Sequence, residues 1–237
     1  MLKEAIEKIT ELATPKTYVI GNDTYTTERL ERVKPFVARP VEIAVSGLDS
    51  ICKLVRSEID KIDATIMIRV SSHDTVNVFT SYLSDFVRNS LYTANADVPG
   101  FRAGWRDYEQ AVIEVRSLFI PNAGSNYLLD LISRMNKDNS VTSEDNGVTQ
   151  TVQAKQGIAL NTLVQINPRV ELTPFRTFLE VDQPSSEYLL RVDGNGKIGL
   201  FEADGGVWKL EAKGNVAKYF EASLSDLVEA GKVVVMI

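Results

Sequence analysis

The spacing of apolar residues predicts an amphipathic helix at the beginning of the chain. Over residues 2–13 they recur every three to four positions, with lysines and glutamates between them, and Pro15 ends the pattern. The apolar stripe consists of Leu2, Ile6, Ile9 and Leu12. An amphipathic helix has to bury its stripe against another surface. Residues 17–20 and 24–26 flank a Gly-Asn-Asp turn, so we expect them to form a short hairpin.

A helix and two β-rich runs are predicted in the next part of the chain. Residues 41–45 indicate a strand that leads into a helix capped by Ser46, and Cys52 lies on the apolar face of that helix. A buried and unreactive thiol is therefore expected. Residues 64–70 and 75–80 are rich in β-branched side chains and are separated by a polar turn, which predicts a hairpin.

The patterns between residues 82 and 137 predict two helices with a strand between them. Residues 82–91 indicate a helix, and residues 109–117 alternate apolar and polar side chains for part of their length, as a strand does. Ser125 stands where it can cap a helix that extends to Lys137. Residues 138–157 contain few apolar side chains, so they are expected to form an extended hairpin arm or a mobile loop.

From residue 158 to residue 211 the pattern is that of successive β-strands. The expected strands are residues 160–166, 170–172, 175–181, 187–192, 197–203 and 207–210. Asp-Gly turns separate the last three of them, which predicts a meander. A helix over about 212–230 and a strand over 232–237 follow. Because the strands occur in blocks, the sequence predicts one α+β domain over residues 1–237, with a mixed or antiparallel sheet, flanking helices, a C-terminal β-meander and the polar arm.

Composition and charge exclude several classes of protein. The chain has 237 residues and a net charge of −6, which disfavours sequence-independent binding of nucleic acid. The longest wholly apolar run is Val233–Ile237, too short to span a bilayer, and the first residues lack the apolar stretch of a signal peptide. A single cysteine and a single histidine exclude a disulfide framework, a cysteine-based zinc site and a multi-histidine metal centre.

The polar motifs that resemble functional sites also have structural explanations. The glycines of residues 194–199 match a dinucleotide-binding pattern, but a strand follows them instead of a helix, so a hairpin turn is expected. His73 and Asp74 are interpreted as a polar turn, and Glu202 and Asp204 as acids where a strand meets a turn. The sequence therefore predicts no catalytic residue, no metal ligand and no cofactor.

Arginines alternate with aromatic residues in two places, a pattern that can hold phosphates and stack on bases. The first place is residues 101–108, with Arg102, Trp105 and Arg106, and the second contains Arg176. The same residues can instead anchor a loop on the core, with buried rings and with Arg106 paired to an acid. The structural interpretation is favoured, and the four residues remain candidate contacts to nucleic acid or to a partner.

The last six residues, Lys232–Ile237, combine strong β propensity with one charge. An exposed edge strand of this kind invites aggregation, so we expect it to be paired on at least one side and covered on both faces. The covering surface is the domain's own sheet or a neighbouring subunit. The candidate subunit interface consists of Val233, Val234, Val235, Met236 and Ile237.

Three stretches, taken in order, carry a family resemblance. They are residues 103–108 (AGWRDY), residues 174–178 (PFRTF) with 180–185 (EVDQPS), and residues 200–208 (LFEADGGVW). Together they resemble the YfdQ-like family of phage and prophage proteins over roughly residues 100–220. The resemblance implies a viral or prophage gene product made in the cytoplasm of a bacterial host. It implies no reaction and no catalytic residue.

These observations predict a non-enzymatic phage or prophage accessory protein that assembles into a homo-oligomer, such as a ring or a coat-like shell, by analogy of architecture. The alternative is an early phage protein that binds nucleic acid or a host defence factor through Arg102, Arg106, Arg176 and the basic stretch 29–39. No membrane partner is expected. A large closed assembly in solution favours the first interpretation, and salt-sensitive binding by a monomer or dimer favours the second.

Overall fold

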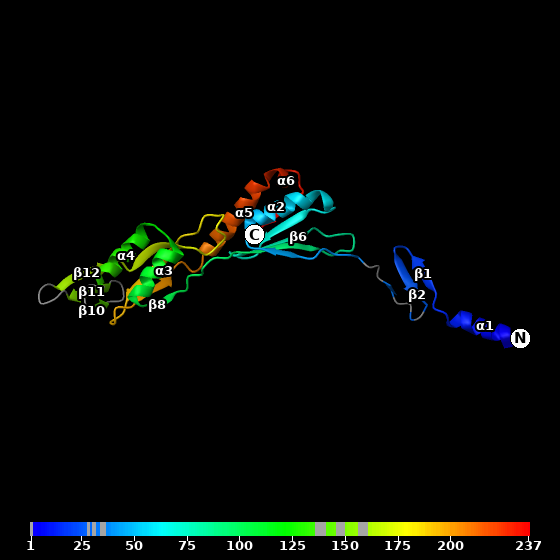
Figure 1. Cartoon of the computed structure of the whole chain (residues 1–237), viewed down its shortest axis with the longest axis horizontal. Helices are drawn as coiled ribbons and strands as arrows, with labels where there is room; N and C mark the ends of the chain where they lie inside the picture. Colours follow the sequence, from blue (N-terminus) through cyan, green and yellow to red (C-terminus); the bar gives the residue numbers. More distant parts are fainter. Residues whose placement is uncertain are drawn as a thin grey trace. The chain divides into compact units, whose positions relative to one another are not determined.

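The chain forms two compact units, residues 1–40 and 41–237 (Figure 1). The computed structural model describes residues 2–27, 29, 32–33, 37–135, 141–145, 150–155 and 161–237. The sequence predicts a single domain over 1–237, because a chain of 237 residues is short for two full domains. Most of the basic stretch 29–39 and parts of the predicted arm lie outside the described residues.

The first unit contains a helix and a small sheet. Helix α1 spans Leu2–Ala13, and strands β1 (Thr17–Ile20), β2 (Asp23–Thr26) and β3 (Arg32–Val33) form an antiparallel sheet in that order. The predicted helix and hairpin are confirmed. Gly21 adopts a positive φ of 63° between β1 and β2, a conformation that glycine reaches without strain. Residues 2–27, 29 and 37–40 of this unit include no buried residue.

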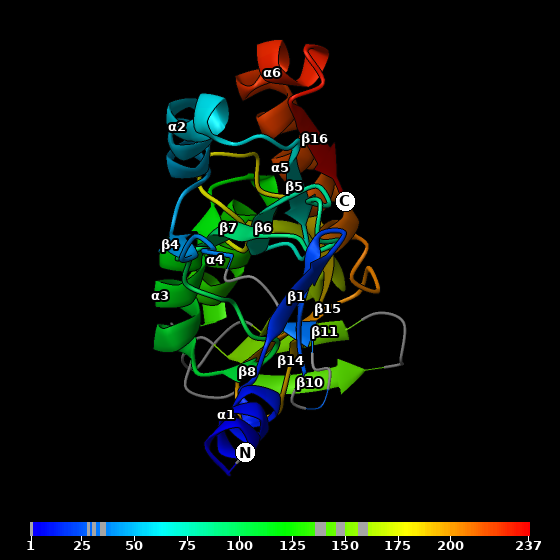
Figure 2. The same cartoon turned by 90° about the vertical axis from the view of Figure 1, so that its right-hand side faces the viewer.

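One half of the second unit is a mixed five-stranded sheet in the order β16-β5-β6-β7-β4. Its strands are β4 (Ile43–Val45), β5 (Ile66–Val70), β6 (Thr75–Thr80), β7 (Ser90–Asn95) and β16 (Val233–Met236). The central strands pair antiparallel, whereas β4 and β16 pair parallel with β7 and β5 at the two edges. Helices α2 (Leu48–Glu58), α5 (Trp208–Ser223) and α6 (Ser225–Glu229) lie on one side of it, and a short 3-10 turn, Ile59–Lys61, follows α2 (Figure 1, Figure 2).

The helices and this sheet enclose a first core. Alternate residues of β5 and β6 point into it, and the buried face of α2 meets them there. Its fully buried members include Leu48, Ile51, Ile66, Ile68, Val78 and Phe220. Cys52 belongs to the same core, and burial raises the pKa of its thiol to about 11. The predicted hairpin over β5 and β6 and the buried, unreactive cysteine are confirmed.

The other half of the second unit is an antiparallel sheet in the order β8-β15-β14-β13-β9. Its strands are β8 (Gly104–Arg106), β9 (Phe119–Ile120), β13 (Arg169–Pro174), β14 (Ser186–Val192) and β15 (Ile198–Glu202). Helices α3 (Tyr108–Leu118) and α4 (Ala123–Met135) share a second core with these strands. The core includes Leu128, Ile132, Leu172, Tyr188 and Leu190. The α+β fold is therefore confirmed. Of the predicted meander, β14 and β15 pair as a hairpin, and the third strand is β13 and not residues 207–210.

A third sheet of the second unit contains β10 (Val141–Asp145), β11 (Gln150–Lys155) and β12 (Asn161–Ile166), paired antiparallel in that order. The predicted arm, residues 138–157, falls on this sheet. Its hairpin form is seen in the backbone of residues 141–145 and 150–155. Residues 138–140, 146–149 and 156–157 lie outside the described residues.

Two predicted elements between residues 82 and 117 are wrong. Residues 109–117 belong to helix α3 and not to a strand, because Ala111 and Val115, four positions apart, are buried whereas Ile113 is 65% exposed. The predicted helix over 82–91 is a loop followed by β7. Residues 90–95 pair along β6, and this tertiary pairing overrides the local helical pattern.

Two predicted strands of the C-terminal half are also wrong. Residues 175–181 form a loop, because the side-chain amide of Gln183 bonds to backbone groups of residues 176, 177, 178 and 181 that a strand would offer to its neighbour. Residues 207–210 form the entry and first turn of α5. Gly205 and Gly206 both take positive φ just before it, which turns the chain out of β15.

The helix caps differ from the predicted ones. Gly47, and not Ser46, precedes α2, and the carboxylate of Glu180 accepts a 2.8 Å hydrogen bond from the backbone N–H of Leu48. At α4, Asn122 and Ser125 bond reciprocally, side chain to backbone N–H, at 2.8 Å in both directions. The predicted serine therefore takes part in the cap of α4 from inside its first turn.

Candidate functional site

The loop at residues 174–185 joins the two halves of the second unit. Phe178 is buried in the first core, although the loop that contains it follows β13, a strand of the second sheet. The hydroxyl of Thr177 donates a 2.5 Å hydrogen bond to the backbone carbonyl of His73 in the β5–β6 turn. Glu180 caps α2 from the same loop. The loop after β13 thus bonds to the β5–β6 turn and to helix α2, and these contacts connect the two halves of the second unit.

A cavity of about 260 Å³ lies at this junction. Its polar walls come from the β5–β6 turn, the loop after β13, strands β14 and β15, and the start of α5. The polar or aromatic residues that the cavity brings together are His73, Asp74, Arg176, Tyr188, Glu202, Trp208 and Lys209. Phe101 and Pro174 add apolar surface. In the sequence these residues belong to separate segments, and folding places them around one space.

Arg176 is the centre of this constellation. Its side chain is only 6% exposed, and its guanidinium carbon lies 3.9 Å from the centre of the Trp208 ring. One terminal nitrogen donates to the carbonyl of Pro184 at 2.9 Å and to the hydroxyl of Ser186 at 2.5 Å, and the other lies 3.3 Å from the carboxylate of Glu202. Arg176 therefore lies inside the protein and does not present its charge on an open surface.

Two buried N–H groups of residues that line the cavity lack a hydrogen-bond partner. They are Nε of Arg176 and Nε1 of Trp208. Every other buried side-chain nitrogen or oxygen among the described residues has a hydrogen-bond partner. Leaving a buried donor unsatisfied costs about 1–3 kcal/mol. Both donors belong to residues that line the cavity. An acceptor oxygen that reached either donor would remove this cost.

His73, the single histidine of the chain, lies against the same indole ring. The two rings meet edge to face with 4.8 Å between their centres. Burial lowers the pKa of His73 below its usual value, and the positive charges of Lys209 and Arg176 act in the same direction, against Asp74 and Glu202. Because its pKa is lowered, His73 is uncharged at neutral pH.

The first arginine–aromatic segment is only partly a surface feature. Arg106 is buried, pairs with Glu114 of α3, and also donates to the carbonyl of Gly104 at 2.7 Å. Its charge is therefore used inside the fold, as the structural interpretation predicts. Arg102 and Trp105 are exposed. Trp105 packs one edge on Phe201, with ring centres 5.7 Å apart, so it is less buried than expected.

A second arginine–aromatic cluster, absent from the sequence prediction, lies on the face of the mixed sheet opposite α2 and α5. Phe79 of β6 has Arg69 of β5 at 5.6 Å and Arg88 at 5.4 Å from its ring centre. Arg88 also lies 4.1 Å from the ring centre of Tyr82. The register of β5 and β6 brings Arg69 near Phe79, and the loop between β6 and β7 supplies Tyr82 and Arg88. Close by in the chain, Phe86 is exposed and adopts a positive φ of 58°.

The C-terminal strand is an edge strand. β16 pairs with β5 on one side, as predicted, and within the described residues no strand pairs with its other side. Val233 is buried, whereas Val234 is 41% exposed and Ile237 is also exposed. Helices α5 and α6 pack on one face of β16, and Val234 on the other face is exposed, so the described chain covers one face alone, and coverage of the other face by a neighbouring subunit stays a prediction. An interface role for Val233–Ile237 stays a prediction.

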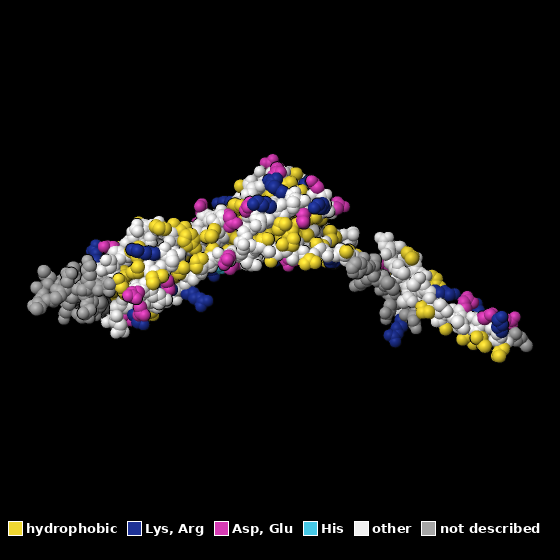
Figure 3. All heavy atoms as spheres, viewed as in Figure 1, with side chains coloured by type: hydrophobic (Ala, Val, Ile, Leu, Met, Phe, Trp, Pro, Cys, Tyr) yellow, Lys and Arg dark blue, Asp and Glu magenta, His cyan; other side chains and the backbone are white. Residues whose placement is uncertain are grey.

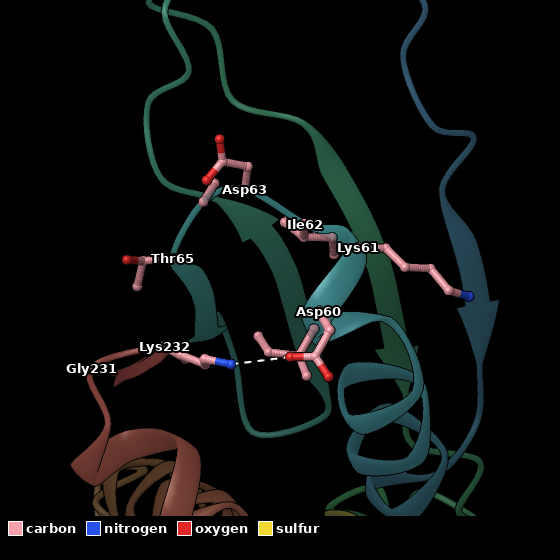
Figure 4. Close-up of a pocket in the computed structure, with 9 residues that line it drawn as sticks. Asp60, Lys61, Ile62, Asp63, Thr65, Gly231 and Lys232 are labelled. Carbon is pink, nitrogen blue, oxygen red and sulfur yellow. Dashed lines mark hydrogen bonds and ion pairs between the residues drawn. The ribbon is translucent and has the colours of Figure 1, made fainter.

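A larger hollow beside β16 is lined by charged side chains that do not point toward a common centre. It has a volume of about 500 Å³ and lies between residues 59–65 and residues 231–232. Figure 4 shows that the ammonium group of Lys232 points to Asp60, 3.1 Å away, while Lys61 and Asp63 point elsewhere. Because its polar groups do not converge, this hollow is a weaker candidate than the cavity around Arg176.

Helix α1 of the first unit exposes its apolar stripe. Leu2, Ile6, Ile9 and Leu12 are each more than half exposed. Figure 3 shows these apolar side chains along one side of the helix and the charged residues along the other. In β1, Tyr18, Val19 and Ile20 are also exposed. The sequence predicts that this stripe is buried, and the described residues of its own unit do not bury it.

Comparisons with known proteins found no matching family model, no similar curated protein and no similar solved structure. Among the described residues, no helix combines the length and the apolar character needed to cross a membrane. The same part of the chain contains no group of three or more histidine, cysteine, aspartate or glutamate side chains suited to hold a metal ion.

Proposed function

We propose that this chain is a non-enzymatic accessory protein of a phage or prophage that assembles with copies of itself through residues 1–40. The observation that carries the assembly is the exposed apolar stripe of α1. The phage or prophage setting and the cytoplasm of a bacterial host rest on the resemblance of residues 100–220 to the YfdQ-like family.

The size of the first unit is the physical argument for assembly. Units of about 40 residues rarely form a sufficient core and usually need disulfides, a metal or oligomerisation. Residues 1–40 contain neither cysteine nor histidine, so a disulfide and a cysteine- or histidine-based metal site are unavailable to them. None of residues 2–27, 29 and 37–40 is buried. Association with another surface is the remaining source of stability.

A second copy of the chain is the proposed partner of α1. A twelve-residue helix is marginal on its own in water. Each large apolar side chain that it buries contributes on the order of 1.5–3 kcal/mol. The same stripe is present on every copy. When a patch packs against the same patch of a second copy, the oligomer is symmetric and closed, and no further apolar patch stays exposed.

The test is the molar mass of the full chain in solution. Light scattering after size-exclusion chromatography should give a multiple of 26.3 kDa. The double substitution Ile6→Asp with Ile9→Asp should reduce the mass to that of a monomer, because it places charges in the stripe. Ile113→Asp is the matched control, since Ile113 is an equally exposed isoleucine on α3 of the second unit.

Two outcomes would contradict the proposal. A wild-type chain that is monomeric at all concentrations would mean that the stripe docks on the second unit or on a different protein. A double variant that keeps the wild-type mass, with its circular dichroism unchanged, would place the interface elsewhere.

A second candidate function is binding of single-stranded nucleic acid, and the cluster of Arg69, Phe79, Tyr82 and Arg88 favours it. Cationic groups beside aromatic rings on an open sheet face can hold phosphates and stack on bases. The net charge of −6 opposes this function. Salt-dependent binding of a labelled oligothymidylate, lost in Arg69→Gln with Arg88→Gln and kept in Arg102→Gln, would favour it over assembly alone.

A further inference from the structure

We propose that the cavity around Arg176 and Trp208 binds the oxyanion group of a small molecule, a carboxylate or a phosphate. This site is separate from the first unit, so it does not depend on the proposed assembly. It is defined by five side chains of the second unit: His73, Arg176, Glu202, Trp208 and Lys209.

The unpaired donors set the chemistry of the ligand. Nε of Arg176 and Nε1 of Trp208 are buried N–H groups without an acceptor, and neither can accept a hydrogen bond. Only a molecule that brings acceptor oxygens satisfies them. Hydrogen bonds from a guanidinium to an anionic oxygen are also stronger than bonds between neutral groups. The two donors therefore select a ligand with an exposed, negatively charged oxygen group.

The start of α5 adds positive potential to the same wall. Trp208 is the first residue of this sixteen-residue helix, and helix N-termini favour negative charge. Lys209 follows it and lines the cavity, with its ammonium nitrogen 5.6 Å from the Trp208 ring centre. The charge of Lys209 is exposed, so it can reach a ligand at the mouth without breaking a buried contact.

The acids of the cavity are already bonded to the protein. Asp74 accepts hydrogen bonds from the hydroxyls of Ser72 at 2.5 Å and Thr75 at 3.2 Å. Glu202 lies 3.3 Å from the guanidinium of Arg176 and 3.4 Å from the hydroxyl of Tyr188. Because these carboxylates have their own donors, they do not require a cation from outside.

The volume limits the ligand to a small molecule. At about 260 Å³ the cavity lies below the roughly 300–1,000 Å³ typical of pockets for drug-sized ligands. Inorganic phosphate or a short organic acid fits this space. Phe101 and Pro174 would contact the apolar part of such an acid.

His73 provides a direct measurement, because it is the single histidine of the chain and its ring touches that of Trp208. The full chain is titrated with sodium phosphate and, separately, with sodium acetate and sodium succinate, at constant pH and ionic strength. The carbon-bound ring proton of His73 is followed by NMR. We expect a saturable shift with at least one probe. Saturation by phosphate alone assigns a phosphate ligand, and saturation by the carboxylates alone assigns an organic acid.

Two variants test whether the shift comes from the proposed donors. Trp208→Phe removes the indole N–H and keeps an aromatic ring, and Lys209→Gln removes the charge at the mouth. Each should weaken binding about tenfold or more, since each removes a bond to a charged group. Lys218→Gln is the matched control, because Lys218 is exposed on the same helix and does not line the cavity.

The proposal is overturned if no probe gives a saturable shift, or if Trp208→Phe and Lys209→Gln bind as the wild type does. It is also overturned if Lys218→Gln weakens binding as much as Lys209→Gln, because the effect would then be general electrostatics. If Trp208→Phe lowers the melting temperature of the free protein, Lys209→Gln decides the result, since its side chain makes no buried contact. The oligomeric mass of these variants should equal that of the wild type.

Discussion

Alanine at Gly124 and alanine at Gly214 should change stability in opposite directions, although both glycines lie in helices. Gly124 is the second residue of α4, and a β-carbon there would lie 2.0 Å from the backbone carbonyl oxygen of Glu171 in β13. Gly214 lies within α5, and its β-carbon position has no atom within 4 Å. The same methyl group therefore meets a fixed backbone in one helix and open space in the other.

The magnitude at Gly124 follows from what has to move. The contact must lengthen from 2.0 Å to at least 3.0 Å, and the obstacle is backbone, so α4 and β13 have to separate. This movement would break the hydrogen bonds from the side-chain amide of Asn122 to Glu171 and to Thr173, at 3.3 and 3.2 Å. Overpacking costs about 1–3 kcal/mol and each lost bond about 1 kcal/mol, so we expect a loss of about 3–5 kcal/mol. At Gly214 alanine should gain about 0.5–1 kcal/mol through its higher helix propensity.

Urea denaturation of the full chain, followed by circular dichroism, measures both effects. The Gly214→Ala midpoint should rise with an unchanged slope, and the Gly124→Ala midpoint should fall steeply. A Gly124→Ala variant within about 1 kcal/mol of the wild type would refute the reasoning, since no flexible side chain is available to relieve the contact. A destabilised Gly214→Ala variant would show that α5 is packed more closely at that point than the structure has it.

Two further predictions concern the C-terminal strand and His73. Deletion of residues 233–237 should yield insoluble protein or a lower melting temperature, because it removes the buried Val233 and uncovers the edge of β5. A folded chain of lower oligomeric mass would place the strand at a subunit interface. A soluble, equally stable chain of unchanged mass would disprove both roles. Burial lowers the pKa of His73 in the folded state below the value of about 6.5 expected when unfolded, so this residue should make folding less favourable as the pH falls from about 6.5 toward the lowered pKa. His73→Gln should remove this pH-dependent loss of stability. The charged groups that also face the ring are Asp74, Glu202, Arg176 and Lys209. An NMR titration that gave His73 a pKa of 6.5 or higher would contradict the prediction.

The sequence predicts elements well where one face alone is buried, and poorly where distant residues decide. The hairpin of β5 and β6 shows a plain alternation, and the structure confirms it. In α3, the apolar residue Ile113 points to solvent between two buried positions and gives the appearance of a strand. The loop after β13 has strand-like composition, but Gln183 occupies its backbone groups. No local sequence pattern predicts such an interaction between a side chain and the backbone.

The cavity was out of reach of sequence reasoning for a related reason. His73 and Arg176 each appeared as a candidate, and each was better explained as structural when taken alone. Their proximity depends on the hydroxyl of Thr177, which bonds to the carbonyl of His73 across more than a hundred residues. The unpaired N–H of Trp208 has no signature in the sequence, because it depends on how α5 enters the junction.

The three stretches that resemble the YfdQ-like family all lie at or beside the junction of the second unit. Residues 174–185 contain Arg176 and Glu180, residues 200–208 contain Glu202 and Trp208, and β8 in residues 103–108 pairs with β15. Helix α1 lies outside the three stretches. The assembly through residues 1–40 and the oxyanion site thus rest on different residues, and the failure of either experiment would leave the other proposal as it stands.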